Sequence, residues 1–240
     1  MLKKGFNEWK NLYIVKNKYC TRNRYVFYDI AAKYLPSNEN STILDIGAGD
    51  GEFINHLSLE KKYERVFLLD MNKETIEDLK KRFKNVILYN APEKLPFENA
   101  SVDLIHCSHM IEHLYYQDLY QFLKEVNRVL EKGGIFIIST PLLSHNFYNN
   151  LTHIKPYEPE IFINYLCVKK RNQTGETISQ DYTSLELVYR YTTLEDYDEG
   201  WGSNSKLVDF LIHIAKMVLS KLKIKNYTKN GYTIVLKKNS

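Results

Sequence analysis

Cysteine is scarce in this chain. Its 240 residues include three cysteines, Cys20, Cys107 and Cys167, an odd number with no Cys-x-x-Cys spacing. A disulfide framework or a structural zinc site built on cysteine needs pairs at short, regular spacings. We therefore expect neither of these in the protein.

Long apolar runs are also missing. No stretch reaches the roughly 18 apolar residues that a membrane-spanning helix needs. Lys3 and Lys4 are followed by polar residues where a signal peptide would have its apolar core. The net charge of +4 is too small to indicate a nucleic-acid partner by itself. The sequence therefore predicts a soluble, cytoplasmic protein without stable membrane insertion and without a nucleic-acid partner.

The most informative stretch is a glycine-rich turn between an apolar run and a helical pattern. The apolar run, 42–46, fits a strand buried on both faces and ends at Gly47-Ala48-Gly49-Asp50-Gly51. Phe53, Ile54 and Leu57 then recur at helical spacing. Glycines let the backbone turn tightly and let a ligand approach it closely. The amino end of the next helix favours anionic or strongly polar groups, so the stretch predicts a cofactor-binding turn.

The spacing of these glycines separates two classes of cofactor. A dinucleotide-binding turn has the pattern Gly-x-Gly-x-x-Gly, and Glu52 stands where its third glycine would be. Asp45 followed by Gly-x-Gly-x-Gly resembles instead the first motif of the Rossmann-like methyltransferases, which use S-adenosylmethionine. That resemblance implies a set of cofactor-binding residues at the turn: Asp45, Gly47, Ala48, Gly49, Gly51 and Phe53.

A second apolar run, 65–70, ends in an acid. Asp70 lies close to the distance along the chain at which a carboxylate binds ribose hydroxyls in nucleotide-binding folds. A carboxylate suits a vicinal diol because it accepts two hydrogen bonds at once. The alternative role, compatible with the first, is an N-cap for the helix expected from about Lys73. Met71 is included with Asp70 in the cofactor site.

The segment from Asn90 to Phe97 follows a third expected strand, 86–89. It resembles the loop that cradles adenine in the same methyltransferase superfamily. The superfamily often has an aspartate where Ala91 stands, to meet the adenine amino group. Asn90 or Glu93 is therefore the candidate for that contact, unless the backbone alone makes it.

Further motifs follow in the order found in that superfamily. A fourth strand, 101–107, leads to Glu112-His113-Leu114, then to a helix that closes at Lys132-Gly133-Gly134 and to a fifth strand, 135–141. The resemblance adds Cys107, Ser108 and His113 to the cofactor site. It implies an α/β fold: a Rossmann-like doubly wound sheet, mostly parallel, with an antiparallel last strand and N-terminal helices.

The expected organisation has two parts. An N-terminal helical cover occupies 1–40, with two helices within 6–35, and a methyltransferase domain occupies 41–240. Insertions on the acceptor side fall at about 142–205. This arrangement leaves the residues beyond the fifth strand to shape the acceptor pocket.

The last hundred residues give weaker patterns. We expect a short helix over 159–166, a strand or a hairpin over 177–191, and a last strand, 232–236, after the tight-turn signal Asn230-Gly231. A helix from about 203 to 222, preceded by Trp201-Gly202, is apolar on more than one face. This indicates packing in the core or against a second copy, as in a homodimer, and an interfacial membrane helix is the alternative.

Histidines gather where the acceptor should bind. One lies near the end of the expected fourth strand and the others follow the fourth and fifth strands: His106, His109, His113, His145 and His153. Binding the two reactants in line can supply roughly 7–11 kcal/mol, whereas a positioned general base adds about 10²–10⁴-fold. The candidate catalytic residues are His113, His153, His109 and Tyr157.

Two of these histidines have the spacing of a metal-binding pair. His109 and His113 are four residues apart, a spacing used by metal-binding pairs on helices. Glu112-His113-Leu114, however, resembles the superfamily's ordinary motif after the fourth strand, which usually carries no metal. The sequence therefore predicts no metal ion.

The segment from His153 to Glu160 indicates an acceptor class. It resembles the segment after the fifth strand in bacterial methyltransferases of surface-polysaccharide and nucleotide-sugar pathways. That resemblance implies that His153 faces the acceptor and that Lys155 or Tyr157 meets a phosphate or hydroxyl. The alternative is a loop anchored by prolines with Tyr157 in the core.

Three functions stay open at this point. The first is an S-adenosylmethionine-dependent methyltransferase that O-methylates a small polar acceptor in surface-polysaccharide biosynthesis. Its acceptor would be a small molecule or glycan precursor, with a sugar hydroxyl or a phosphorylated or phosphoramidate-type group. The second keeps the cofactor but places the acceptor on RNA or protein. The third is a non-catalytic module that binds the cofactor.

Overall fold

The computed structural model describes residues 2–144, 146–167, 177–193, 205–221 and 227–239. Its contacts define two compact units. The larger unit comprises Asn23–Val188 with Gly231–Ser240, and the smaller unit comprises Met1–Arg22 with Tyr189–Asn230. Two features of the sequence analysis lie outside the described residues. They are His145, one of the histidines expected near the acceptor, and Trp201-Gly202, which precedes the helix expected from about 203.

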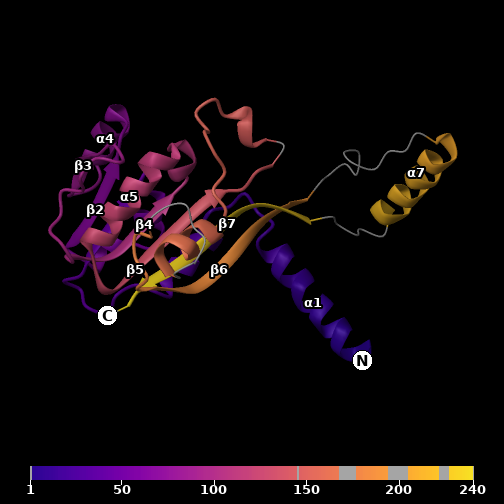
Figure 1. Cartoon of the computed structure of the whole chain (residues 1–240), viewed down its shortest axis with the longest axis horizontal. Helices are drawn as coiled ribbons and strands as arrows, with labels where there is room; N and C mark the ends of the chain where they lie inside the picture. Colours follow the sequence, from indigo (N-terminus) through magenta and orange to yellow (C-terminus); the bar gives the residue numbers. More distant parts are fainter. Residues whose placement is uncertain (1, 145, 168–176, 194–204, 222–226, 240) are drawn as a thin grey trace. The chain divides into compact units, whose positions relative to one another are not determined.

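A seven-stranded sheet with the order β3-β2-β1-β4-β5-β7-β6 organises the fold (Figure 1). Strands β3, β2, β1, β4 and β5 are parallel to their neighbours, and β7 is antiparallel to β5. This confirms the predicted fold class. The strands are β1 (Thr42–Ile46), β2 (Arg65–Asp70), β3 (Val86–Leu88), β4 (Val102–Ser108), β5 (Leu130–Pro141), β6 (Tyr182–Thr193) and β7 (Tyr227–Lys238).

Strand β1 lies between β2 and β4, and all five of its residues are buried. Helix α5, Tyr116–Val129, has one apolar face that is buried. The buried side chains on this face are Leu119, Phe122, Leu123, Val126 and Val129. Burial of each such side chain contributes about 1.5–3 kcal/mol, which is why apolar runs and stripes specify this part of the fold. The other helices are α2 (Tyr25–Ala32), α3 (Glu52–His56), α4 (Lys73–Lys80) and α6 (Glu160–Phe162).

Shorter helical turns connect these elements. Three of them are 3₁₀ turns, and the fourth, after α6, is a π-helical turn that completes the short helix expected over 159–166. For 177–191 the sequence predicted either a strand or a hairpin, and the structure has one strand there, β6. The turns are η1 (Leu59–Lys61), η2 (Ile111–His113), η3 (Phe147–Asn149) and η4 (Ile163–Cys167).

Helix α5 ends earlier than the sequence pattern predicts. It was expected to close at Gly133-Gly134, but it stops at Val129, and Leu130 already has extended backbone angles. The reason is strand pairing, because Leu130 lies opposite Val102 in the β4–β5 ladder. Gly133, with φ of +85°, lies inside β5 instead of capping the helix.

The prediction of a tight turn at Asn230-Gly231 is also wrong. Strand β7 runs through both residues without a break, and Gly231 pairs with Pro141 of β5. In the smaller unit, Arg190 Nε donates a hydrogen bond to Asn230 Oδ1 at 3.2 Å. Pairing with neighbouring strands therefore outweighs the local turn preference of the dipeptide.

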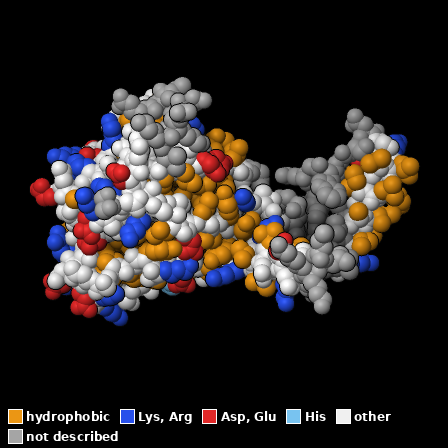
Figure 2. All heavy atoms as spheres, turned by 60° about the horizontal axis from the view of Figure 1, so that its bottom comes forward, with side chains coloured by type: hydrophobic (Ala, Val, Ile, Leu, Met, Phe, Trp, Pro, Cys, Tyr) orange, Lys and Arg blue, Asp and Glu red, His pale blue; other side chains and the backbone are white. Residues whose placement is uncertain are grey.

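The smaller unit contains helices α1, Leu2–Lys18, and α7, Lys206–Lys221, whereas α2 belongs to the larger unit. Helices α1 and α2 are the two N-terminal helices that the sequence predicts. Large apolar side chains of α7 are exposed, and Figure 2 shows orange side chains gathered over this helix. They include Leu207, Phe210, Leu211, Ile214 and Val218. None of the described helices has the length and apolar character needed to cross a membrane.

Candidate functional site

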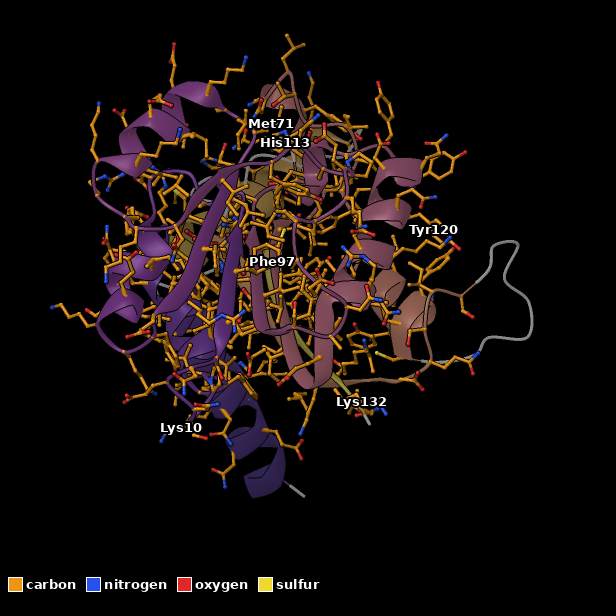
Figure 3. All side chains as sticks on the ribbon, turned by 90° about the vertical axis from the view of Figure 1, so that its left-hand side faces the viewer. Lys10, Met71, Phe97, His113, Tyr120 and Lys132 are labelled. Atoms are coloured by element: carbon orange, nitrogen blue, oxygen red, sulfur yellow. The ribbon has the colours of Figure 1, made fainter. Side chains whose placement is uncertain are left out.

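A pocket of about 700 Å³ opens in the larger unit where β1, β2 and β4 reach their carboxyl ends. Ligands of open parallel sheets bind at this end, and the volume suits a small-molecule site. Figure 3 shows Met71 and His113 together at this end of the sheet. The predicted site residues that line the pocket are Gly47, Gly49, Asp70, Met71, Asn90, Ala91, His109, His113 and His153.

The glycine turn is closed on one side and open on the other. Gly47, Gly49 and Gly51 all have φ between +54° and +77°, a conformation that other residues rarely adopt. A Cβ on Gly51 would stand 2.6 Å from the ring of Phe83, whereas a Cβ on Gly49 would have no described atom within 4 Å. The backbone at Gly49 is therefore the place where a ligand can approach the turn closely.

Alanine substitutions at these two glycines should separate folding from binding. Gly51→Ala forces a left-handed alanine against Phe83 and should lower the free energy of unfolding by roughly 2–5 kcal/mol. Gly49→Ala carries only the backbone strain, about 1–2 kcal/mol. Its methyl group enters the pocket, so it should instead weaken cofactor binding by about tenfold or more. Urea denaturation and calorimetric titration of both variants check this, and equal loss of stability would contradict the packing described.

Asp70 joins the end of β2 to the glycine turn. The N–H of Gly49 donates to its Oδ2 at 3.0 Å, and the N–H of Asn72 donates to its Oδ1 at 2.9 Å. Each carboxylate oxygen keeps a further lone pair. The N-cap alternative is wrong, because the cap of α4 is Asn72, whose side-chain oxygen accepts from the N–H groups of Glu74 and Thr75.

Several predicted residues lie beneath the pocket and do not line it. Asp45 is buried and its Oδ1 lies 2.7 Å from His106 Nδ1, while its Oδ2 has no hydrogen-bond partner among the described residues. The ring of Phe53 stacks on His106 at 3.8 Å. The predicted residues outside the lining are Asp45, Ala48, Gly51, Phe53, Glu93, Cys107, Ser108 and Tyr157.

The pairing of Asp45 with His106 was missed by sequence reasoning. The two residues lie opposite each other in neighbouring strands, β1 and β4. A histidine within the apolar part of the strand, between Ile105 and Cys107, was the signal that could have indicated it. The pair supports the strand ends under the turn, and Cys107 beside it is buried, which raises the pKa of its thiol well above the usual value.

The loop after β3 is held from below by α5. Glu125 Oε2 accepts a hydrogen bond from the N–H of Leu95 at 2.9 Å. Arg128 donates to the carbonyls of Leu95 and Phe97 at 2.9 and 2.8 Å, and to Glu125. These contacts fix the loop whose first residues, Asn90 and Ala91, line the pocket together with Tyr89, which the sequence did not single out.

Glu125→Gln should lower stability in a pH-dependent way. The hydrogen bond from Arg128 holds the pKa of Glu125 below its ordinary value, although partial burial opposes this. Because the folded-state pKa is the lower one, the carboxylate stabilises the fold above the unfolded pKa of about 4.3 and loses this effect as the pH falls below it. We expect a loss of about 1–2 kcal/mol at pH 7, which shrinks as the pH falls through the folded-state pKa. Urea titrations across pH check it, and a pH-independent difference would contradict it.

Glu112 lies at the other end of the pocket, in η2, with a fully buried side chain. Its Oε2 accepts from Thr140 Oγ1 at 3.1 Å, and its Oε1 lies 3.2 Å from His109 Nδ1. Burial raises the pKa of this carboxyl, but contact with His109 and the nearby His113 outweigh it and leave the pKa below its usual value. Glu112 is therefore a buried carboxylate that carries its charge.

The loop after β5 docks onto η2 through its backbone. The N–H of Ile154 donates to the carbonyl of Glu112 at 2.8 Å. His113 Nδ1 lies 3.0 Å from the carbonyl oxygen of Thr152, and His153 Nδ1 lies 2.7 Å from that of Phe147. The two imidazole rings meet edge to face at 4.9 Å. Residues far apart in the chain thus form one wall of the pocket.

Tyr157 lies away from this wall. Its side chain is buried, its hydroxyl donates to the carbonyl of Leu114 at 2.8 Å, and burial raises its pKa to about 12. It lines a separate, largely apolar groove beside α5, together with Lys155 and Tyr120. The structure therefore places Tyr157 in the core, and neither it nor Lys155 lines the histidine-bearing pocket.

Polar residues that the sequence did not single out complete the pocket. Arg24, Asp118 and Asn150 line it beside the histidines. Arg24 immediately precedes α2, so the N-terminal segment contributes to the site, as its position before the glycine turn allowed. No local spacing connects these three residues, which only the folded chain brings together.

Comparison with known proteins agrees with this geometry. Residues 44–138 match the family model described as a methyltransferase domain. The chain is 35% identical over 100 residues to a probable S-adenosylmethionine-dependent methyltransferase of Mycolicibacterium smegmatis, covering 41% of this chain and 37% of that protein. It is 27% identical over 117 residues to the demethylmenaquinone methyltransferase of Chlorobaculum tepidum, covering 48% and 47%. The chain thus spans less than half the length of these curated relatives.

Solved structures match over nearly the whole chain. A SAM-dependent methyltransferase from Archaeoglobus fulgidus superposes with a TM-score of 0.61 at 22% identity, covering 95% of this chain and 99% of that one. The YcgJ protein from Bacillus subtilis gives a TM-score of 0.57 at 17% identity, covering 88% and 97%. At these identities the likeness shows the fold.

The fold, the open glycine turn and the family match together define residues 44–138 as a class I methyltransferase domain. S-adenosyl-L-methionine is its methyl donor. The residues present fit this cofactor, because Gly49 offers open backbone and Asp70 offers carboxylate lone pairs at the same pocket. Asp70 would hold the ribose hydroxyls, and Asn90 and Ala91 would lie beside the adenine.

Proposed function

We propose that the whole chain is an S-adenosylmethionine-dependent methyltransferase acting on a small polar acceptor. One observation carries this proposal: Gly49 and Asp70, the residues predicted to bind the cofactor, line the same pocket as His109, His113 and His153. The donor and the acceptor can therefore be bound side by side. In-line positioning of two reactants supplies roughly 7–11 kcal/mol of the barrier reduction.

The protein's own residues have three tasks in this reaction. When bound, the cofactor supplies an electrophilic methyl group on a sulfonium. Asp70 and the glycine turn orient it, and the loop from His153 to Ile154 closes the acceptor side of the pocket. His113 and His153 each donate Nδ1–H to a main-chain carbonyl, which leaves the Nε2 lone pair free to act on the acceptor. Either Nε2 atom can take the proton of an acceptor hydroxyl as a general base.

The proposed acceptor is a sugar hydroxyl or a phosphorylated or phosphoramidate-type group of a surface-polysaccharide precursor. The segment from His153 to Glu160, which resembles that of surface-polysaccharide methyltransferases, supports this. The pocket adds support because Arg24, Asp118 and Asn150 give it a polar, hydrogen-bonding lining. The match to the methyltransferase domain model covers 44–138 and leaves out His153, so it carries no information on the acceptor.

The partners follow from the same proposal. A small-molecule or glycan-precursor acceptor needs neither nucleic acid nor a membrane, so we keep the cytoplasmic placement as part of the proposal. The exposed apolar side chains of α7 support the homodimer predicted from the sequence.

The test is a transfer assay with S-adenosylmethionine labelled in its methyl group. Separate arms contain sugar nucleotides, glycan fragments, phosphorylated metabolites, total RNA and total protein. We expect label in one of the first three arms. Label only in RNA or protein would replace the acceptor proposal. Cofactor binding without transfer in any arm would support a non-catalytic binding module.

A further inference from the structure

We propose that Glu112, His113 and His153 bind a divalent first-row transition metal ion at the acceptor side of the pocket. One ligand atom from each of the three residues lies within 4.8 Å of the others. The inference rests on the proposed function, because the metal would bind in the pocket where the acceptor is proposed to bind. It also departs from the sequence prediction, which considered His109 and His113 as the metal-binding pair and predicted no metal ion.

The hydrogen bonds of both histidines prepare them as ligands. Nδ1–H of His113 donates to the carbonyl of Thr152 at 3.0 Å, and Nδ1–H of His153 donates to that of Phe147 at 2.7 Å. Metal-binding histidines almost always donate their second ring N–H to such an acceptor, which fixes the tautomer and the ring orientation. In both residues the lone pair for an ion is then on Nε2.

Glu112 supplies the negative charge. Its side chain is fully buried, its Oε2 accepts from Thr140 Oγ1, and its Oε1 forms an ion pair with His109 Nδ1 at 3.2 Å. A buried carboxylate costs several kcal/mol unless it is paired or binds a metal. A cation held between this carboxylate and the two imidazoles adds to the compensation that His109 provides.

The backbone beside Glu112 is strained in a way that keeps His109 near it. His109 has φ of +53°, a left-handed conformation that costs a residue other than glycine about 1–3 kcal/mol. Its N–H donates to the carbonyl of Ser139 at 2.8 Å, which pins this conformation to β5. A residue keeps such a strained conformation only where the surrounding structure holds it in place, and such residues occur most often at functional sites.

The donor set indicates the kind of ion. Two imidazole nitrogens and one carboxylate oxygen suit Zn²⁺, Mn²⁺, Fe²⁺ or Co²⁺, whereas Ca²⁺ and Mg²⁺ prefer oxygen alone. A metal with bonds of about 2.1 Å has ligand atoms roughly 3–4 Å apart, so the three ligand atoms must move closer together when the ion binds. Three protein ligands leave coordination positions open toward the pocket.

The ion gives the acceptor site its chemistry. A hydroxyl oxygen of the acceptor that binds an open position has a lowered pKa and loses its proton to solvent. That oxygen forms a bond to the methyl carbon as the carbon–sulfur bond of the sulfonium breaks, leaving a neutral thioether. No protein base is needed in this step, because the metal has already made the oxygen nucleophilic.

Cobalt binding tests the proposal directly. Chelator-treated full-length protein is titrated with CoCl₂ and followed by visible absorption, with ZnCl₂ as competitor. We expect one ion per chain and displacement by zinc. His113→Gln and His153→Gln should each weaken binding by about 100-fold or more, because loss of an outer-shell contact alone costs about 10–100-fold. His213→Gln, on the exposed surface of α7 in the smaller unit, is the matched control and should bind as the wild type does.

S-adenosylhomocysteine affinity, measured on the same variants, separates the possible failures. Unchanged affinity shows that the pocket is folded and the cofactor site is intact. Absence of cobalt binding in the wild type, or binding that both histidine variants retain, would overturn the metal site without touching the proposed function. Methyl transfer that continues at full rate in excess chelator would overturn the role given to the ion.

Discussion

Replacing Asp70 with alanine lowers the affinity for S-adenosylhomocysteine by at least about 100-fold. A carboxylate that accepts both hydroxyls of a ribose makes two charge-assisted hydrogen bonds, each contributing about 1.5–3 kcal/mol. The substitution also removes the hydrogen bond that Asp70 accepts from Gly49, so the turn loses its support from β2. Asp70→Asn keeps one acceptor oxygen and should lose roughly 10- to 150-fold. Calorimetric titration measures both.

The control for this prediction is Asp78→Ala on α4. Asp78 is exposed and pairs with Lys81 at 2.6 Å, outside the pocket lining. This variant should bind S-adenosylhomocysteine as the wild type does, and all three variants should keep a cooperative thermal transition. If Asp70→Ala binds as tightly as Asp78→Ala, the carboxylate does not hold the cofactor.

Replacing His153 with alanine lowers turnover by about 10²–10⁴-fold and leaves cofactor affinity within about twofold. His153 lines the acceptor side of the pocket, and its ring is held by a 2.7 Å contact to the carbonyl of Phe147. Its loss removes the Nε2 lone pair whether that atom takes a proton or holds an ion. The measurement is the initial rate of label transfer to the acceptor found in the panel assay.

His213→Ala is the matched control for this second prediction. His213 is exposed on α7 in the smaller unit, and its substitution should leave the rate unchanged. Normal turnover in His153→Ala would assign His153 to loop anchoring alone. A fall in both turnover and cofactor affinity would mean that the loop carrying His153 shapes the cofactor site as well.

The fold followed from the sequence because burial and local turn chemistry agree over most of the chain. Strand β1 is apolar and wholly buried, and three glycines stand where φ is positive. Local patterns failed where long-range pairing decides the backbone. Asn230-Gly231 continues a strand because Gly231 pairs with Pro141, and α5 stops at Val129 because Leu130 pairs with Val102.

The site was less accessible to sequence reasoning for a similar reason. Gly49 and Asp70 lie at strand ends, where a parallel sheet brings them together. The wall of Glu112, His113 and His153 depends instead on main-chain contacts, such as that from Ile154 to the carbonyl of Glu112, which no side-chain pattern encodes. Tyr157 was predicted as a catalytic candidate from the resemblance of its segment to surface-polysaccharide methyltransferases, but its hydroxyl donates to the carbonyl of Leu114 in the core.

The central claim is that the pocket at the carboxyl ends of β1, β2 and β4 binds the methyl donor. Crystals grown with saturating S-adenosylhomocysteine test it most directly. We predict density that passes over Gly49, with the ribose hydroxyls within hydrogen-bonding distance of Asp70 and the sulfur directed toward His113 and His153. Density at any other place on the molecule, or an empty pocket at saturating ligand, would contradict the claim.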